Sequence, residues 1–477
     1  MLELTIQLQT DNDKCLYEQI YEYIQGEIKE GKLLQGERLP STRSLAENLQ
    51  VARSTVEMAY EQLLSEGYIE SRPYKGYFVC KIEELFQLDE GRIGERKSSL
   101  EQAEPTGAEG YTYDFSPTQI DMSGFPFSVW RRLHKKVLED GNEQLYARGD
   151  AQGDYGFRET IARYLHASRG VNCTPEQIIV GAGNDYLLML LEKILGRELS
   201  IAMENPTYKR AYRIFRSFSY PITTVDMDES GMMVEELRKT DAQLAYVMPS
   251  HQYPTGTVMP IGRRSELLKW ANEKEDRYLI EDDYDSEFRY KGKPIPSLQA
   301  SDKYGKVIYI GTFSKSIAPA IRVSYMVLPE NLVQAYREKC YFYSTTVSRI
   351  EQKILDEFIR GGYFERYLNK MRKYYRDKHD LLLEELEPFE KEFDITGENA
   401  GLHLLLTSKS GRTEAELIEK AGMHGIKIYG LSDSLSDGTK DTSYTVILGY
   451  GSLSMREIEE GVEALKKAWN IKNRVAH

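Results

Sequence analysis

The sequence is poor in cysteine and holds no long apolar run, and each shortage excludes a class of protein. Its 477 residues include only 4 cysteines, and no two of them form a CxxC pair. This scatter argues against a zinc site and against a secreted disulfide framework, and it fits a reducing compartment. No stretch approaches the roughly 20 apolar residues of a membrane-spanning helix, and the N-terminus lacks the apolar core of a signal peptide. We therefore expect a cytoplasmic protein without a metal centre or membrane contact.

The sequence also lacks an excess of basic charge. Its 62 Lys and Arg residues stand against 75 Asp and Glu residues, which gives a net charge of −13. A negative balance argues against a protein that coats nucleic acid, although it leaves room for a small, local DNA contact. The chain is long enough for two or more domains, and 41% hydrophobic with 29% charged residues is an ordinary globular balance.

Residues 14–80 have the pattern of a small helical unit that ends in a hairpin. Apolar side chains recur on one helical face of LYEQIYEYIQGEIKEG. Ser41 is a candidate N-cap for a short helix, TRSLAENL. Ser54 is a candidate N-cap for a third helix, TVEMAYEQLLSEG, which Gly67 would end. Two short apolar strands, YIES and GYFVC, then flank RPYK, so the predicted order is helix, short helix, turn, helix and β-wing.

The composition changes after residue 80. Residues 81–111 are rich in Glu, Gly and Ser and contain little that could be buried, which predicts a flexible linker. From residue 112 onward, short apolar runs alternate with helical segments, as in QIIVGAG, LSIAMENP, QLAYVMPS, RYLIEDDYD and KVIYIGTFSK. This alternation predicts an α/β domain with a parallel sheet, whose strand carboxyl ends carry the ligand. The predicted parts are therefore a domain at 1–80, the linker at 81–111 and a domain at 112–477.

The stretch ERLPSTRSLAENLQVARSTVEMAYEQLLSEGYIESRPYKGYFV resembles the GntR-type winged helix-turn-helix along almost its full length. The resemblance implies that the third helix enters the major groove with its N-terminal residues and that the wing tip approaches the DNA backbone. Residues 1–80 carry 8 basic against 13 acidic residues, so the alternative is a degenerate winged helix used for protein contact. The candidate DNA-binding residues are Arg43, Arg53, Ser54, Thr55, Lys75 and Gly76.

The larger region resembles a fold-type-I aminotransferase, and the whole chain resembles the MocR subfamily of GntR regulators, notably its GabR-like members. The matching stretches include GDAQGDYGFRETIARYLHASRGV, ENPTYKRAY, PSHQYPTG, IEDDYDSEFRY and GTFSKSIAPAIRVSYM. The resemblance implies pyridoxal 5′-phosphate (PLP) as the cofactor and a homodimer in a head-to-tail arrangement. It also implies double-stranded operator DNA as a partner, bacterial nucleoid association when DNA is bound, and an effector that is a small amino compound or PLP itself.

The resemblance assigns chemical roles to residues of this cofactor site. Lys315, in the turn TFSK, would hold the cofactor aldehyde as a Schiff base. Asp282 would pair with the ring nitrogen and keep it protonated. Tyr284 would reach the ring hydroxyl, and Tyr208 would stack on the ring. The phosphate would be held by Thr312 and Arg322, and by the turn and helix start at Gly183, Asn184 and Asp185.

The part of the site that would recognise an effector departs from the aminotransferase pattern. Arg210 and His251 are the candidate effector-binding residues, but His251 and Gln252 lie where aminotransferases hold the ring oxygen with an asparagine. Ile447 stands where the arginine that clamps a substrate carboxylate is expected, and Arg412 is the only arginine between residues 395 and 450. Either Arg210 holds a carboxylate, or the effector lacks one, or PLP itself is the signal. We expect a regulator with little or no transamination, and the alternative is a working aminotransferase with an accessory DNA-binding domain.

Overall fold

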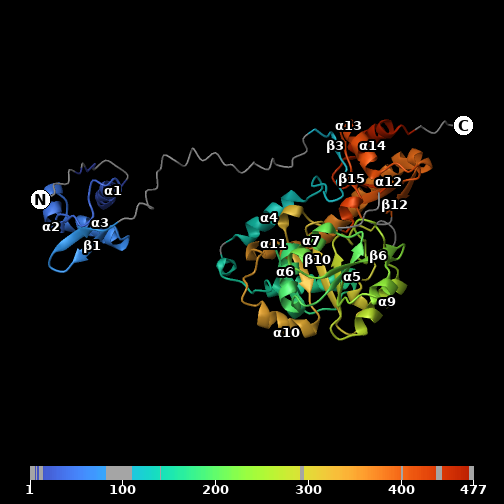
Figure 1. Ribbon diagram of the computed structural model, residues 1–477, viewed down its shortest axis with the longest axis horizontal. Helices are drawn as coiled ribbons and strands as arrows, with labels where there is room; N and C mark the ends of the chain where they lie inside the picture. The colour runs from blue at the N-terminus through green and yellow to red at the C-terminus, as the bar shows by residue number, and fades with distance from the viewer. Residues whose placement is uncertain are drawn as a thin grey trace. The chain divides into compact units, whose positions relative to one another are not determined.

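The computed structural model describes residues 6, 8–9, 14–81, 110–139, 141–289, 295–398, 401–436 and 443–471 (Figure 1). The chain divides into two compact units, Met1–Thr106 and Gly107–His477. Nearly all of the predicted linker, residues 81–111, lies outside the described residues, so its flexibility stays a prediction. In the part of the chain that the structure describes, no helix is long and apolar enough to cross a membrane.

The N-terminal unit has the predicted order of elements. Helices α1 (Leu16–Lys29), α2 (Thr42–Leu49) and α3 (Arg53–Ser65) precede the antiparallel hairpin of β1 (Ile69–Arg72) and β2 (Gly76–Val79). The three helices close around one apolar core because α1 and α3 each turn a single apolar stripe inward. Its fully buried side chains include Ile20, Ile24, Val56, Tyr60 and Leu63. The predicted winged helix-turn-helix is confirmed.

Two of the three helix ends that the sequence predicts in this unit, at Ser41 and Gly67, are found in the structure. The Ser41 hydroxyl accepts a hydrogen bond from the backbone N–H of Ser44 at 3.1 Å, which caps α2 as predicted. Gly67 adopts a φ of 76° just after α3, as expected for the residue that ends a helix. The prediction that Ser54 caps α3 is wrong. The helix begins two residues earlier than predicted, with Ala52 as its N-cap and no side-chain cap, so Ser54 lies exposed in the first turn.

The large unit is built on a mixed sheet. Its strand order is β4-β11-β10-β9-β8-β5-β6-β7, and β10, β9, β8, β5 and β6 run parallel. The predicted parallel strands are present, and the sheet is mixed because β11 is antiparallel to both β10 and β4 and β7 is antiparallel to β6. The turn between β10 and β11 is too short for a helical crossover, so the chain has to return in the opposite direction. The strand bounds are β4 (Ile178–Gly181), β5 (Ile201–Asn205), β6 (Ile222–Asp228), β7 (Gly231–Met232), β8 (Leu244–Val247), β9 (Tyr278–Asp283), β10 (Val307–Thr312) and β11 (Ser324–Val327).

Helices cover both faces of this sheet, because successive strand residues point to opposite sides. In β9, Ile280 packs into a cluster with side chains of α6, while Leu279 packs into a cluster with side chains of α9. Both side chains are fully buried. The helices of this part are α4 (Phe127–Val137), α5 (Tyr155–Arg169), α6 (Asn184–Leu195), α7 (Lys209–Ser217), α8 (Val234–Arg238), α9 (Ile261–Asn272), α10 (Glu330–Lys339) and α11 (Arg349–Arg360).

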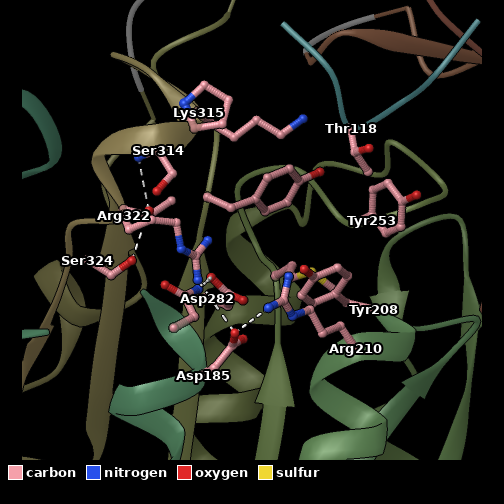
Figure 2. A pocket seen from close by; sticks show the side chains of 15 residues that line it. Thr118, Asp185, Tyr208, Arg210, Tyr253, Asp282, Ser314, Lys315, Arg322 and Ser324 are labelled. Carbon is pink, nitrogen blue, oxygen red and sulfur yellow. Dashed lines mark hydrogen bonds and ion pairs between the residues drawn. The ribbon is translucent and has the colours of Figure 1, made fainter. Parts of the chain in front are cut away.

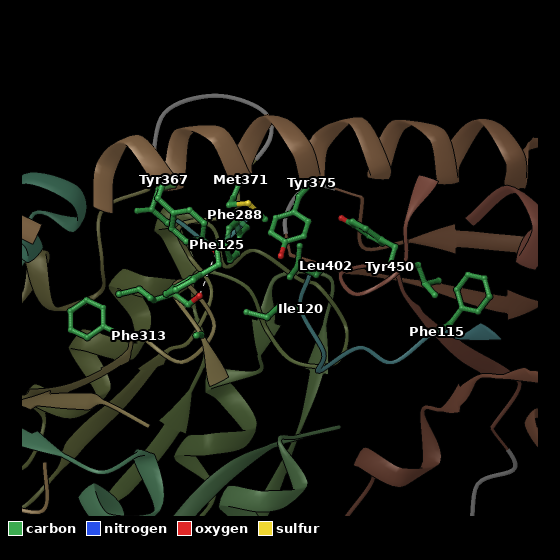
Figure 3. Close-up of a cluster of buried hydrophobic side chains, with 14 of the residues drawn as sticks. Phe115, Ile120, Phe125, Phe288, Phe313, Tyr367, Met371, Tyr375, Leu402 and Tyr450 are labelled. Atoms are coloured by element: carbon green, nitrogen blue, oxygen red, sulfur yellow. Dashed lines mark hydrogen bonds between the residues drawn. The ribbon is translucent and has the colours of Figure 1, made fainter. Parts of the chain in front are cut away.

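A smaller antiparallel sheet forms the C-terminal lobe of the large unit, with the strand order β12-β13-β16-β15. The long helix α12 (Tyr363–Leu386) runs along the buried cluster that joins the lobes, from Phe313 at one end to Tyr450 and Phe115 at the other (Figure 3). The remaining elements of this lobe are β3 (Tyr113–Asp114), β12 (Phe393–Thr396), β13 (His403–Ser408), α13 (Glu414–Met423), β14 (Ile426–Lys427), β15 (Tyr429–Gly430), β16 (Thr445–Gly449) and α14 (Met455–Trp469).

Candidate functional site

The carboxyl ends of the parallel strands meet at a cavity of about 200 Å³ (Figure 2). Residues of β9 and β10 contribute to its wall, and so do the segments that follow β4, β5 and β8. Parallel strands end at one edge of a sheet, so residues far apart in the sequence become neighbours there. Nine predicted residues line the cavity: Asn184, Asp185, Tyr208, Arg210, Asp282, Tyr284, Thr312, Lys315 and Arg322.

Lys315 enters the cavity from the turn after β10. Its Nζ atom donates a hydrogen bond to the carbonyl oxygen of Pro117 at 3.2 Å. Burial lowers the pKa of the Lys315 ammonium, and the charge of Asp285 opposes this shift only in part. An amine with a lowered pKa is unprotonated more often at neutral pH, which makes it a better nucleophile.

Asp282 lies at the end of β9 with its carboxylate buried. The Tyr246 hydroxyl donates to one carboxylate oxygen, and the amide of Asn184 donates to the other at 3.3 Å. Burial nevertheless raises the pKa of Asp282 to about 7, and the charge of Asp283 adds to this effect. A buried carboxyl group of this kind is stabilised by a cation placed against it.

The part of the cavity next to the start of α6 is built for an anion. Gly183 precedes α6 with a φ of 96°, and a side chain there would collide with the guanidinium of Arg322. Glycine therefore lets the arginine approach the start of α6, where backbone N–H groups and the helix dipole favour negative charge. The Thr312 hydroxyl accepts bonds from the N–H of Ser314 at 3.1 Å and from the hydroxyl of Ser324 at 2.9 Å.

Two polar atoms in the cavity wall have no partner among the described residues. They are the Ser314 hydroxyl and the side-chain oxygen of Asn184, and both are buried. Buried polar atoms in native proteins are nearly always hydrogen-bonded. Their position at a cavity with a cationic end therefore indicates that a polar ligand belongs there.

Asp185 lies between two arginines at the anion end (Figure 2). It pairs with Arg210, and its carboxylate is 3.5 Å from the guanidinium of Arg322. Tyr208 lines the same wall and makes an edge-to-face contact with Tyr253, with the ring centroids 5.8 Å apart. Tyr253 follows Gln252 directly, so an aromatic ring stands in the region where aminotransferases carry an asparagine.

His251 does not line the cavity, so its predicted contact with an effector is wrong. Its ring is 2% exposed and lies behind Tyr284. Strand alternation does not reveal this depth, because the segment PSHQYPTG follows β8 as an irregular loop. Sequence reasoning also missed Tyr246, although its position in the apolar run QLAYV marked it as a buried hydroxyl that needs a partner.

Neither Ile447 nor Arg412 brings a charge to the cavity. Ile447 is buried in β16, where it pairs with Leu405 and Tyr429 of the neighbouring strands. Arg412 binds Glu392 and the carbonyl oxygen of Trp469. Among the residues that the structure describes, the cations that line the cavity are Arg210, Lys315 and Arg322.

The candidate DNA contacts lie on the surface of the N-terminal unit. Arg43 in α2 is 80% exposed and pairs with Glu47 at 3.0 Å, and Arg53 in α3 is 64% exposed and pairs with Glu57 at 2.8 Å. Ser54 and Thr55 follow in the first turn of α3. The wing tip turns at a bond from the N–H of Lys75 to the carbonyl of Arg72, at 3.0 Å, and Gly76 adopts a φ of 100°.

Comparison with known proteins agrees with this two-part architecture. Residues 16–79 match the family of bacterial regulatory proteins of the gntR type, and residues 119–431 match the family "Aminotransferase class I and II". The HTH-type transcriptional regulator YdeL of Bacillus subtilis is 41% identical over 98% of this chain and 100% of its own. The probable rhizopine catabolism regulatory protein MocR of Rhizobium meliloti is 31% identical over 97% of this chain and 95% of its own. The multiple substrate aminotransferase of Thermococcus profundus superposes with a TM-score of 0.68 at 26% identity, covering 76% of this chain and 93% of that one.

Fold, site and relatives define a DNA-binding transcription regulator whose second unit has an aminotransferase fold. The chain belongs to the GntR family of bacterial regulators, in the group with an aminotransferase class I and II domain that includes MocR.

Proposed function

We propose that this regulator binds operator DNA through its N-terminal unit and senses a small amino compound, or PLP itself, at the cavity of its large unit. One observation carries the proposal: Lys315, Asp282 and Arg322 reach the same cavity from separate parts of the sheet. A lysine, a buried carboxylate and an arginine at a helix start are the groups that a PLP site requires.

The cavity fits PLP at each of its ends. The cofactor phosphate would lie between Arg322 and the start of α6, where backbone N–H groups can donate to it. The protonated ring nitrogen would supply a cation next to the buried Asp282, which would oppose the effect of burial on its pKa. Tyr208 would lie against the ring face, as an aromatic wall.

PLP supplies an aldehyde that reacts with primary amines and a ring that withdraws electrons. Lys315 would hold the cofactor covalently, and its depressed pKa keeps the amine reactive. A Lys315 amine that is not bonded to the cofactor could donate a hydrogen bond to the carbonyl oxygen of Pro117, which lies 3.2 Å away in this structure. Release of Lys315 by an amino compound would therefore change contacts next to the start of the large unit.

The cavity is poorly equipped for turnover. Transamination needs the substrate carboxylate held firmly, so that the bond to be broken stands perpendicular to the ring. Ile447 gives no charge for this purpose, and Arg210 is half-exposed and already paired with Asp185. We therefore infer a site that binds and releases an amine without efficient conversion.

A homodimer completes the proposal. Large apolar side chains are exposed on α4, on the turn at 143–146 and after α10, namely Phe127, Tyr146 and Phe342. Arg349 bonds to the carbonyl oxygens of Gln144 and Ala147, which holds the second of these segments against the start of α11. Single exposed apolar side chains are common on protein surfaces, so the dimer is proposed on the resemblance to aminotransferases, and these three side chains are assigned to its interface as part of that proposal. A monomeric mass by sedimentation at micromolar concentration would contradict this part.

The test of the proposed function is a titration of operator DNA affinity with PLP and with a panel of amines and amino acids. The purified protein should show the near-visible absorption of bound PLP, and Lys315→Ala should lose it. Lys303→Ala, which changes an exposed loop lysine, is the matched control and should keep it. Unchanged absorption in Lys315→Ala would refute the cofactor assignment. Release of keto acids at the rate of a known aminotransferase would favour the alternative enzyme function.

A further inference from the structure

We propose that His251 and Asp285 form a positioning pair that turns the hydroxyl proton of Tyr284 into the cofactor cavity. The inference rests on the proposed function, because it assigns this proton to an acceptor oxygen of the bound cofactor. It gives His251 a role different from the effector contact predicted for it, and it brings in Asp285, which sequence patterns did not single out.

The three side chains form a buried chain of contacts behind the cavity wall. His251 Nδ1 lies 2.9 Å from the Tyr284 hydroxyl oxygen. The same Nδ1 atom lies 3.1 and 3.0 Å from the two carboxylate oxygens of Asp285. His251 and Asp285 are 2% and 3% exposed, whereas Tyr284 lines the cavity. One ring nitrogen therefore faces three oxygen atoms at hydrogen-bond distance.

This arrangement determines where the imidazole proton lies. A carboxylate only accepts hydrogen bonds, so Nδ1 has to carry a proton toward Asp285. Because Nδ1 already carries a proton, it cannot accept one from the Tyr284 hydroxyl. The Tyr284 oxygen can only accept, together with Asp285, the hydrogen bond that Nδ1–H donates. The tyrosine proton then has to point elsewhere. The described residues provide no other hydrogen-bond partner for this hydroxyl besides His251, and the open direction is the cavity that Tyr284 lines.

The surroundings of Nε2, the other ring nitrogen of His251, agree with this tautomer. Nε2 is buried and has no partner among the described residues. Backbone at Gly256 and Gly401 packs against the ring, and a side chain at Gly401 would collide with it. A buried N–H without an acceptor is costly, so the proton is better placed on Nδ1, where oxygen atoms surround it.

A second histidine beside His251 does not compete for Asp285. The ring centroids of His251 and His403 are 5.4 Å apart. Burial lowers the pKa of His403 to about 3, so this ring is neutral at ordinary pH. Its Nε2 lies 2.8 Å from the carbonyl oxygen of Pro254. A carbonyl accepts, so Nε2 carries the proton of His403.

Tyr284 keeps its proton for donation. Burial raises the pKa of the Tyr284 hydroxyl well above its usual value, and the charge of Asp285 raises it further. The other titratable groups that act on it are Tyr253, Asp282 and Asp283. Lys315 lines the same cavity. Tyr284 therefore brings to the cavity that it lines a hydroxyl that remains protonated and can donate to an acceptor oxygen of the bound cofactor.

The experiment follows the pH titration of the cofactor absorption band. A donor to the ring oxygen stabilises its anion, so losing that donor shifts the titration midpoint to higher pH, by about 1 pH unit. Tyr284→Phe sets the size of the full effect. Asp285→Leu removes the carboxylate that accepts the Nδ1 proton and leaves no amide oxygen to replace it. The histidine would then carry its proton on Nε2, Tyr284 would donate to Nδ1 instead of the cavity, and the midpoint should shift as in Tyr284→Phe.

Two further variants separate positioning from a merely structural role. His251→Asn retains an N–H near the Nδ1 position and should restore most of the parent midpoint, whereas His251→Phe should not. In the Tyr284→Phe background, His251→Phe should add no further shift. His166→Gln, which changes an exposed histidine, is the control and should leave the midpoint unchanged.

The outcomes are separable from those of the proposed function. Absence of any cofactor band in the parent protein would defeat the proposed function and this inference together. A band in the parent with the Asp285→Leu midpoint unchanged, while Tyr284→Phe is shifted, would overturn the positioning pair alone. Nitrogen-15 NMR of histidine-labelled, cofactor-free protein gives a second readout. The His251 signal, assigned by its loss in His251→Asn, should report the tautomer protonated on Nδ1. Protonation on Nε2 would refute the inference, and this readout remains available even if His251→Phe does not fold.

Discussion

Arg53 gives the sharpest quantitative test of the DNA-binding surface. Its guanidinium is 64% exposed and pairs with Glu57, one turn further along α3, at 2.8 Å. An arginine that reads a base contributes about 1–3 kcal/mol. Before it reaches DNA it has to leave Glu57, and an exposed pair at this spacing is worth about 0.3–0.5 kcal/mol. After the lost ion pair is subtracted, about 0.5–2.7 kcal/mol remains, so Arg53→Ala should weaken operator binding about 2- to 100-fold.

Substitution of Glu57, the ion-pair partner of Arg53, should change operator affinity in the opposite direction. Glu57→Gln releases Arg53 from its ion pair and removes a negative charge close to the proposed contact. Operator affinity should rise about twofold, which corresponds to the 0.3–0.5 kcal/mol of the exposed pair. If Arg53 only stabilised α3, Glu57→Gln would instead weaken binding, because both substitutions would then remove the same stabilising pair.

A gel-shift or fluorescence anisotropy titration at fixed salt measures both effects. Lys14→Ala is the control, because it also breaks an exposed ion pair of this unit, with Glu22 at 2.6 Å. The control variant should bind like the parent, and thermal unfolding should show that each variant is folded. If Arg53→Ala binds operator DNA within a factor of two of the parent, the assignment of α3 as the recognition helix is refuted.

Three other substitutions test the large unit. Gly183→Ala should displace Arg322, with which its side chain would collide, and should weaken PLP binding in a fluorescence-quenching titration. Glu204 is fully buried, and burial raises the pKa of its carboxyl group to about 8, although hydrogen bonds with Gln252, Met248 and Met232 oppose this shift. The parent should therefore lose stability as pH rises from 5 to 8, and Glu204→Gln should abolish that loss in urea titrations. Hydrogen bonds from Ser123, Lys378 and Tyr374 lower the pKa of the Asp121 carboxyl group to about 2, because together they outweigh the opposing effect of its burial. The contribution of Asp121 to stability should therefore disappear as pH falls from 4 toward 2. Asp121→Asn should be less stable than the parent at pH 7 but not below pH 2.

Much of the cofactor site was predictable because its residues stand directly after recognisable strands. Asp282 ends the apolar run RYLI, and Lys315 follows KVIYIGT within a few residues, so strand ends alone place them at one edge of the sheet. Thr312 and Arg322 keep a short distance in sequence from Lys315. Local spacing is sufficient in these cases, because the turn holds all three side chains near one another.

The errors arise where depth or direction depends on tertiary packing. His251 follows β8 in a loop, and the sequence does not show that Tyr284 lies between it and the cavity. The antiparallel direction of β11 is likewise invisible in an apolar run, since both directions bury the same residues. Ser54 is a strong capping residue by type, yet the helix begins two residues earlier than that preference predicts, and tertiary contacts of α3 override it.

The pairing of Arg210 with Asp185 bears on how a sensing site can respond to a carboxylate. An acidic effector would gain Arg210 only by separating it from Asp185, so its net gain is the difference between two ion pairs. The pair is half-exposed, and exposed pairs are worth about 0–1 kcal/mol, so that difference is small. Arg210 would then select for a carboxylate without binding it tightly. Weak, reversible capture is a disadvantage for an enzyme that must hold its substrate through several steps. It suits a regulator, whose occupancy has to follow the concentration of its effector.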